Sequence, residues 1–180
     1  GEILPQEVAF ELVNKVLGGD GEVGRGYLPP IFDDYAWEPS KQQQREFDLD
    51  KANRMLDEAG YKKGPDGTRQ TPDGKPLNFN FVLHGSEPAD TQVGEFVKRW
   101  LSEVGINVEL EPVSDNQLND RTTAGNFDMV ISGWSANPDP DYVLRLQTCS
   151  ARPDPQGGGT PDSFLCDEKY DELYRNQLTE

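Results

Sequence analysis

The 180-residue sequence predicts an α/β fold, in which helices flank a parallel βαβαβ sheet and long irregular segments lie at both ends. Two observations predict this fold. Three short runs are strand-like, two because apolar and polar residues alternate in them and one because it is a compact apolar run. Between these runs, a helical stripe of apolar residues and a capped polar segment predict helices, and connections of this length join parallel strands through right-handed crossovers.

Two helices and a long loop are predicted before the sheet. Apolar residues at helical spacing predict a helix over 9–17, and residues 18–47 follow as a loop with few periodic signals. A second helix begins after Asp48, a suitable N-cap, and ends before Gly60, a suitable C′ residue. Residues 61–76 contain two Pro-Asp-Gly turns with a short ribbon between them.

The first half of the predicted sheet consists of a strand, a helix and a second strand. Residues 77–83 alternate between apolar and polar side chains and predict the first strand. An unbroken apolar stripe over 93–104 predicts a helix that Gly105 ends. Residues 106–110 alternate again and predict a second strand with one face toward solvent.

A short helix and a third strand complete the predicted sheet. Ser114 is a suitable N-cap for a helix that extends through Leu118. The apolar run over 127–131, interrupted only by Asp128, predicts a third and more buried strand. The connection between the second and third strands has about a dozen residues, which is close to the minimum for a parallel crossover.

The composition argues against several classes of function. The net charge is −16, and a surface of this sign repels phosphate backbones, so we expect no nucleic-acid partner. No apolar run is long enough to span a bilayer, and residues 1–17 lack the features of a signal peptide. Both ends fall inside helical patterns, the second at 177–180, so we expect the chain to be cut from a longer protein.

Cys149 and Cys166 are the only cysteines, and both lie in one segment rich in Pro and Gly. A disulfide between them is favoured over two free thiols and fits an oxidising compartment. The two thiols and the single histidine, His84, do not make up the usual four-ligand zinc site. We therefore expect a structural bridge and no metal.

Open parallel sheets bind ligands in the crevice beyond the carboxyl ends of their strands. This rule points to residues 84–87, 114–116 and 133–141, which follow the three predicted strands. In the last segment Trp134 offers a broad surface with an N–H donor, and Asp139 lies between prolines that fix the backbone. The pattern allows Trp134 equally well to be a core residue.

The sequence contains no recognisable catalytic motif. His84 at a strand end is more typical of a hydrogen-bonding residue than of a catalyst, because no Ser or Cys in a nucleophile motif accompanies it. Gly85 is a single glycine and forms no phosphate-binding loop. Asp139 and Asp141 share a Pro-rich turn, with nothing nearby to give them the separate roles of paired catalytic acids. We expect a binding protein without cofactors; a flavodoxin-like enzyme domain and a secreted protein-interaction module are the alternatives.

Four motifs occur in order between residues 47 and 141. They are the Asp-Lys-Ala to Ala-Gly-Tyr helix at 50–61, the Asp-Gly-Lys-Pro-Leu entry to a strand at 73–77, the Val-Gly-Ile-Asn-Val joint at 104–108, and the Phe-Asp, Trp and Asp-Pro-Asp signature between 127 and 141. Together they resemble the C-terminal lobe of the family 5 extracellular solute-binding proteins, which serve ABC importers of peptides and nickel.

The resemblance implies a periplasmic-binding-protein-like type II lobe, one of two lobes that close on a ligand about a hinge. It divides the chain into an N-terminal helix and loop (1–46), the ligand-binding lobe (47–141), and a disulfide loop with a helix leading back toward the absent first lobe (142–180). The implied ligand is an oligopeptide or peptide-like compound, and the implied partner is the membrane permease of an ABC importer. The implied location is extracellular, as a cell-surface lipoprotein or in the periplasm.

The carboxyl-edge rule and the resemblance together give a set of candidate ligand-binding residues. They are Trp134, Ser135, Asn137, Asp139, His84 and Ser86. Trp134 is expected to stack on the ligand, and the polar side chains are expected to orient it. In peptide-binding members an Asp shortly after the Trp holds the ligand's α-ammonium, and the nearest equivalent here is Asn137. A neutral amide cannot form that ion pair, which leaves modified peptides, sugars and other solutes open.

Overall fold

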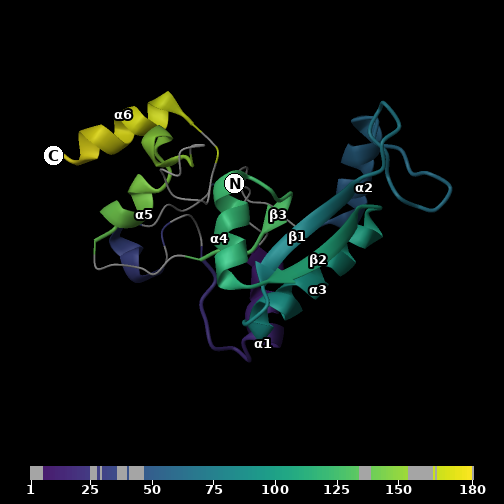
Figure 1. Cartoon of the computed structure of the whole chain (residues 1–180), viewed down its shortest axis with the longest axis horizontal. Coiled ribbons are helices and arrows are strands. Elements are labelled where there is room, and N and C mark those ends of the chain that lie inside the picture. Colours follow the sequence, from purple (N-terminus) through teal and green to yellow (C-terminus); the bar gives the residue numbers. More distant parts are fainter. Residues whose placement is uncertain are drawn as a thin grey trace.

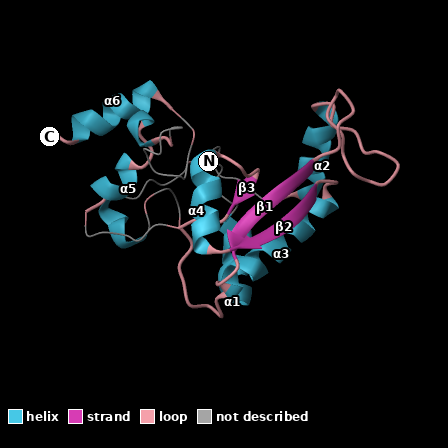
Figure 2. Cartoon of the chain, in the orientation of Figure 1, coloured by secondary structure: helices cyan, strands magenta, loops and turns pink. Residues whose placement is uncertain are grey.

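The computed structural model describes residues 6–24, 28, 30–35, 40, 47–133, 139–153, 164 and 166–179. Its α-helices are α1 (Gln6–Val16), α2 (Leu49–Glu58), α3 (Pro88–Glu103), α4 (Asp115–Ala124), α5 (Asp141–Arg145) and α6 (Glu168–Gln177). The 3-10 helices are η1 (Pro30–Tyr35) and η2 (Cys149–Ala151), and the strands are β1 (Asn78–His84), β2 (Asn107–Val113) and β3 (Met129–Val130). Figures 1 and 2 show the sheet between α2, at one end of the long axis, and α5 with α6, at the other.

The three strands form one parallel sheet in the order β2-β1-β3, which confirms the predicted βαβαβ unit. β1 pairs with β2 along its whole length, from Asn78 opposite Asn107 to His84 opposite Val113. β3 pairs with the other edge of β1 and is only 2 residues long. β1 is therefore the central strand, and β3 is held by far fewer backbone hydrogen bonds than β2.

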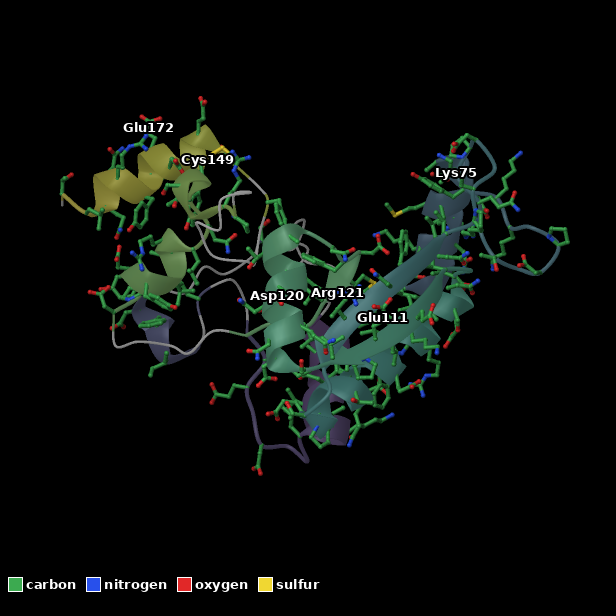
Figure 3. The ribbon with its side chains drawn as sticks, in the orientation of Figure 1. Lys75, Glu111, Asp120, Arg121, Cys149 and Glu172 are labelled. Atoms are coloured by element: carbon green, nitrogen blue, oxygen red, sulfur yellow. A yellow bond between two sulfur atoms is a disulfide. The ribbon has the colours of Figure 1, made fainter. Side chains whose placement is uncertain are left out.

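The two crossover helices cover opposite faces of the sheet. α3 packs on the face that carries Leu83 and Leu110, and α1 packs against α3. On the other face α4 places Arg121 beside Glu111 of β2, and the two side chains form an ion pair (Figure 3). Because successive residues of a strand point to opposite faces, Leu110 and Glu111 fix which helix covers which face.

Gly94 allows α3 to approach the sheet closely. It is the buried residue of this helix, and a Cβ there would lie 2.9 Å from Cδ2 of Leu83 and 3.2 Å from Cδ2 of Leu110. Leu83 is completely enclosed, so its side chain has no space into which to move. The apolar stripe predicted over 93–104 does not reveal this contact, because the residue that makes it has no side chain.

The prediction of a more buried third strand is wrong. Met129 and Val130 are half-buried, whereas Val82 and Leu83 of β1 have no exposed surface. The cause is the strand order, which places β1 at the centre of the sheet and β3 beside only one neighbour in the described part of the chain. A short apolar run by itself does not distinguish a central strand from an outer one.

α4 is longer than predicted, since it extends to Ala124 rather than ending at Leu118. Its second half is polar and gives no apolar period. Two other features stabilise it. Arg121 forms an ion pair with Glu111, and Gly125 adopts the left-handed conformation that ends the helix, with φ of 68°. The predicted cap at Ser114 is confirmed as part of a capping box with Gln117.

Two further predictions about helices need correction. Residues 18–47 were expected to form a loop, yet they contain η1, whose Phe32 is buried. The expected helical pattern at 177–180 is also wrong, because α6 ends at Gln177. By contrast, Asp48 caps α2 as predicted and accepts a hydrogen bond from the backbone N–H of Lys51 at 2.8 Å.

The turn segment 61–76 is attached to the lobe through one buried arginine. Two antiparallel bridges, one around each Pro-Asp-Gly turn, form the predicted ribbon. Arg69 lies between the turns with only 1% of its surface exposed. Its Nε donates to the carbonyl of Val104 at 2.7 Å, and its terminal nitrogens donate to Asn53 and Asp57 of α2. This side chain therefore links α2, the ribbon and the end of α3.

α5, η2 and α6 form a unit stapled by the predicted disulfide. Cys149 and Cys166 are bonded, with their Cα atoms 4.5 Å apart. In α6, Tyr170 donates to the carbonyl of Leu144 at 2.7 Å, and Asp171 accepts from the backbone N–H of Cys149 at 2.9 Å. No helix among the described residues is long and apolar enough to cross a membrane.

Tyr174 makes the attachment of α6 dependent on pH. Its hydroxyl donates to Asp141 of α5 at 2.8 Å, and burial, reinforced by this hydrogen bond, raises the pKa of the phenol. The folded state holds this proton more tightly than the unfolded chain does. The stabilisation is therefore complete below about pH 10, the ordinary tyrosine pKa, and is lost as the pH rises through the higher folded-state value.

We expect the free energy of unfolding to fall less between neutral and alkaline pH in Tyr174→Phe than in the unsubstituted protein, because the variant has no phenol to ionise. Urea titrations on either side of the tyrosine pKa measure the difference. Tyr35→Phe is the control, since Tyr35 is 66% exposed in η1. An equal pH dependence in all three proteins would contradict a role for Tyr174.

Candidate functional site

The carboxyl ends of the strands meet at one edge of the sheet, as predicted. β1 ends at His84 and β2 at Val113, and these residues are opposite each other in the register. The next residue, Gly85, donates its backbone N–H to the carbonyl of Val113 at 2.8 Å. A Cβ on Gly85 would lie 3.2 Å from that oxygen, so the absence of a side chain allows the two loops to touch.

His84 and Asp90 form a pair at this edge. Nδ1 of His84 lies 2.8 Å from Oδ2 of Asp90, in the first turn of α3, and both side chains are mostly buried. The contact fits the interpretation of His84 as a hydrogen-bonding residue. The contact occupies Nδ1 and holds the imidazole in one orientation. The role of His84 in binding stays a prediction.

Ser86 and Asp115 connect the loops that follow β1 and β2. The Ser86 hydroxyl donates to Oδ1 of Asp115 at 3.3 Å, and Asp115 is the first residue of α4. The edge therefore presents a serine hydroxyl and carboxylates from two helix starts. Asp90 was not predicted as part of the site, although an acidic residue in the first turn of a helix is a recognisable signal.

The third predicted segment is described only in part. Trp134, Ser135 and Asn137 lie outside the described residues, so the orientation of the tryptophan stays a prediction. Asp139 is described: its Oδ1 accepts the backbone N–H of Asp141 at 2.8 Å, which starts α5. Asp141 in turn accepts from Tyr174, so both carboxylates contact their own end of the chain.

Metal ligands do not gather in the described ranges: no three His, Cys, Asp or Glu side chains there are placed to hold an ion. The edge offers donors and acceptors around the ends of β1 and β2. The segment that follows β3 begins at Ile131, at the same edge of the sheet. Such an arrangement is suited to holding a ligand by hydrogen bonds.

Comparison with known proteins identifies the family. The sequence profile of the bacterial extracellular solute-binding proteins, family 5 Middle, matches residues 10–154. The chain belongs to this family. The match includes the whole sheet, and it confirms the resemblance that the motifs between residues 47 and 141 indicated.

Two curated relatives illustrate the likeness. The chain is 29% identical over 138 residues to the oligopeptide-binding protein OppA of Lactococcus lactis subsp. cremoris (strain SK11), which covers 72% of this chain and 23% of OppA. It is 30% identical over 137 residues to the oligopeptide-binding protein AppA of Bacillus subtilis (strain 168), covering 72% of this chain and 24% of AppA. The chain thus spans about a quarter of the length of these relatives.

Solved structures confirm the periplasmic-binding-protein-like fold. AppA from Bacillus subtilis in complex with a nonapeptide matches 97% of this chain and 33% of its own, at 25% identity and a TM-score of 0.71. The periplasmic murein tripeptide binding protein MppA, in its unliganded open form, matches 96% of this chain and 31% of its own, at 22% identity and a TM-score of 0.69. Both are binding proteins, as are the curated relatives.

Proposed function

We propose that this chain is the second lobe of a two-lobed solute-binding protein, and that it holds an oligopeptide or a peptide-like compound in the cleft between the lobes. The observation that carries the proposal is the family match over residues 10–154, because it covers the sheet and the segment that follows β3. The curated relatives named oligopeptide-binding proteins support a peptide as the ligand.

The geometry of the edge supports a role in binding rather than in chemistry. His84 and Ser86 lie beside the carboxyl ends of β1 and β2, and each already has a carboxylate partner. Trp134 would add an aromatic surface, and Ser135, Asn137 and Asp139 would orient the ligand. Closure of the two lobes on the ligand would exclude water and favour the ligand-bound state of a hinge equilibrium. No catalytic step is needed for this function.

The delivery of the ligand follows from the same proposal. The permease of an ABC importer would receive the solute from the closed protein. The chain would act outside the cytoplasm, anchored as a lipoprotein or free in the periplasm. The disulfide between Cys149 and Cys166 supports this location, because such bonds persist in oxidising compartments.

A native mass spectrum of the two-lobed protein tests the proposal through a co-purified small molecule. A bound peptide is the expected result. Trp134→Ala should then weaken the binding of that peptide at least about tenfold, which corresponds to about 1.4 kcal/mol, while Trp134→Phe should retain most of the affinity. Equal affinity in all three proteins would contradict the assigned role of Trp134, and a protein that captures no solute would contradict the function.

The 180-residue chain alone should bind the same peptide weakly or not at all. It supplies only one side of the proposed cleft, so half of the contacts and the exclusion of water are missing. Isothermal titration of residues 1–180 against the two-lobed protein measures the difference. Tight binding by the shorter chain would show that the ligand sits within this lobe, contrary to the proposal.

A further inference from the structure

Asn80 and Asp128 form a reciprocal pair across the junction between β1 and β3. The backbone N–H of Asn80 donates to Oδ2 of Asp128 at 2.8 Å, and the backbone N–H of Asp128 donates to Oδ1 of Asn80 at 2.6 Å. Each side chain therefore accepts from the backbone of the other residue. The two positions are separated by 48 residues in sequence and stand one step before Phe81 and Met129 in the register.

This pair extends the hydrogen bonding between β1 and β3 by one position, just before the first residue of β3. Val82 faces β3, because its carbonyl accepts the N–H of Ile131 at 3.1 Å. Asn80 is two residues earlier, so its N–H points toward the same edge. A carboxylate oxygen meets that N–H in place of a main-chain carbonyl. The side-chain bonds thus fix the start of a strand that has only 2 residues of its own.

The register of β3 decides where the following segment leaves the sheet. A slip by one residue would turn every side chain of a strand to the opposite face. β3 is followed at once by Ile131, Ser132 and Gly133, and then by the segment that contains Trp134. With so few ladder bonds, an additional pair of anchoring bonds has a large share in holding this short strand.

We propose that Asp128, together with Asn80, is a positioning residue: the pair sets the register of β3 and thereby the place from which the ligand-binding segment departs. This inference rests on the proposed function only for its effect on binding. Asp128 itself would not touch the ligand, since it lies at the amino end of β3, away from the carboxyl edge. The effect of a substitution would reach the ligand through the strand.

Exchange of the two side chains provides a sharp test. Asn80→Asp places two carboxylates side by side, and their repulsion should break the pair. Adding Asp128→Asn restores one carboxylate and one amide, with an acceptor for each backbone N–H. Hydrogen exchange of the Ile131 amide in the 180-residue chain should speed up about tenfold in Asn80→Asp and return to its original rate in the exchanged variant. The Asn107 amide, which donates to Leu77 beside β2, is the internal control and should not change.

Binding is measured separately in the two-lobed protein, with a mixture of short unmodified oligopeptides as the probe. Asn80→Asp should weaken the binding about tenfold, and the exchanged variant should recover it. Unchanged exchange at Ile131 in Asn80→Asp would overturn the role of the pair in the register. Faster exchange with unaltered peptide affinity would overturn the positioning role and leave the proposed function intact. If the unsubstituted protein binds none of these peptides while Ile131 responds as expected, the proposal of an unmodified oligopeptide as the ligand fails and the role of the pair in the strand stands.

Discussion

Replacing Arg69 by methionine is expected to lower the free energy of unfolding by about 3–5 kcal/mol. The guanidinium is enclosed and donates to three main-chain carbonyls, those of Asn53, Tyr61 and Val104, as well as to two side chains. Asp57 is 63% exposed, so water can replace its share of the ion pair. Most of the loss comes from the carbonyls, which methionine leaves without a donor.

Urea denaturation of Arg69→Met measures this effect, and Lys75→Met is the matched control. Lys75 pairs with Asp73 at 3.3 Å, but both side chains are largely exposed (Figure 3 labels Lys75), so its loss should change stability by less than about 0.5 kcal/mol. Arg69→Lys keeps the charge but not the planar fork of donors, and should recover only part of the stability. Full recovery in that variant would show that charge alone matters and would contradict the interpretation.

Removal of the disulfide is expected to cost about 3 kcal/mol, because the bond closes a loop of about 17 residues and restricts the unfolded chain. The effect should be local at first. Without the bond, α6 is held to α5 and η2 by the hydrogen bonds of Tyr170, Asp171 and Tyr174. Loss of protection should therefore appear in 141–151 and 166–178, while β1 and β2 remain protected.

Hydrogen exchange with and without dithiothreitol measures the loss of protection. The variant with both Cys149→Ala and Cys166→Ala is the control, since the reductant should not change its exchange rates. Equal loss of protection in the sheet would show that the whole chain unfolds as one cooperative unit. That outcome would contradict the local effect predicted here.

The parallel sheet could be predicted from sequence because its signals are local. Residues 77–83 and 106–110 alternate with the period of strands, and Gly105 between helix and strand has φ of 85°, as a helix-ending glycine should. Ser114 met the requirements of a helix cap in the same way. Each of these features depends on residues within one turn or one strand, which a linear pattern records.

The missed features depend on residues far apart in the chain. Arg69 reaches a carbonyl 35 residues away, and Asp128 meets a residue 48 positions away, so neither contact leaves a local pattern. β1 is more buried than β3 because it is the central strand, and the strand order cannot be inferred from the periodicity of the sequence. At the site, the sequence placed His84, Ser86 and Asp115 in the segments that follow the first two strands. Asp90, and the pairing of Ser86 with Asp115, required the assembled edge.

Phe164 sets a limit on where the protein can be shortened. Its ring lies against Gly125, where a Cβ would be only 3.0 Å from Cζ, and its centroid is 6.3 Å from that of Phe127. An aromatic ring that packs on the turn leading into β3 thus comes from a residue two positions before Cys166. A version truncated directly after β3 would lose this ring contact, whereas one that ends beyond Cys166 keeps both the ring and the disulfide that restrains its segment.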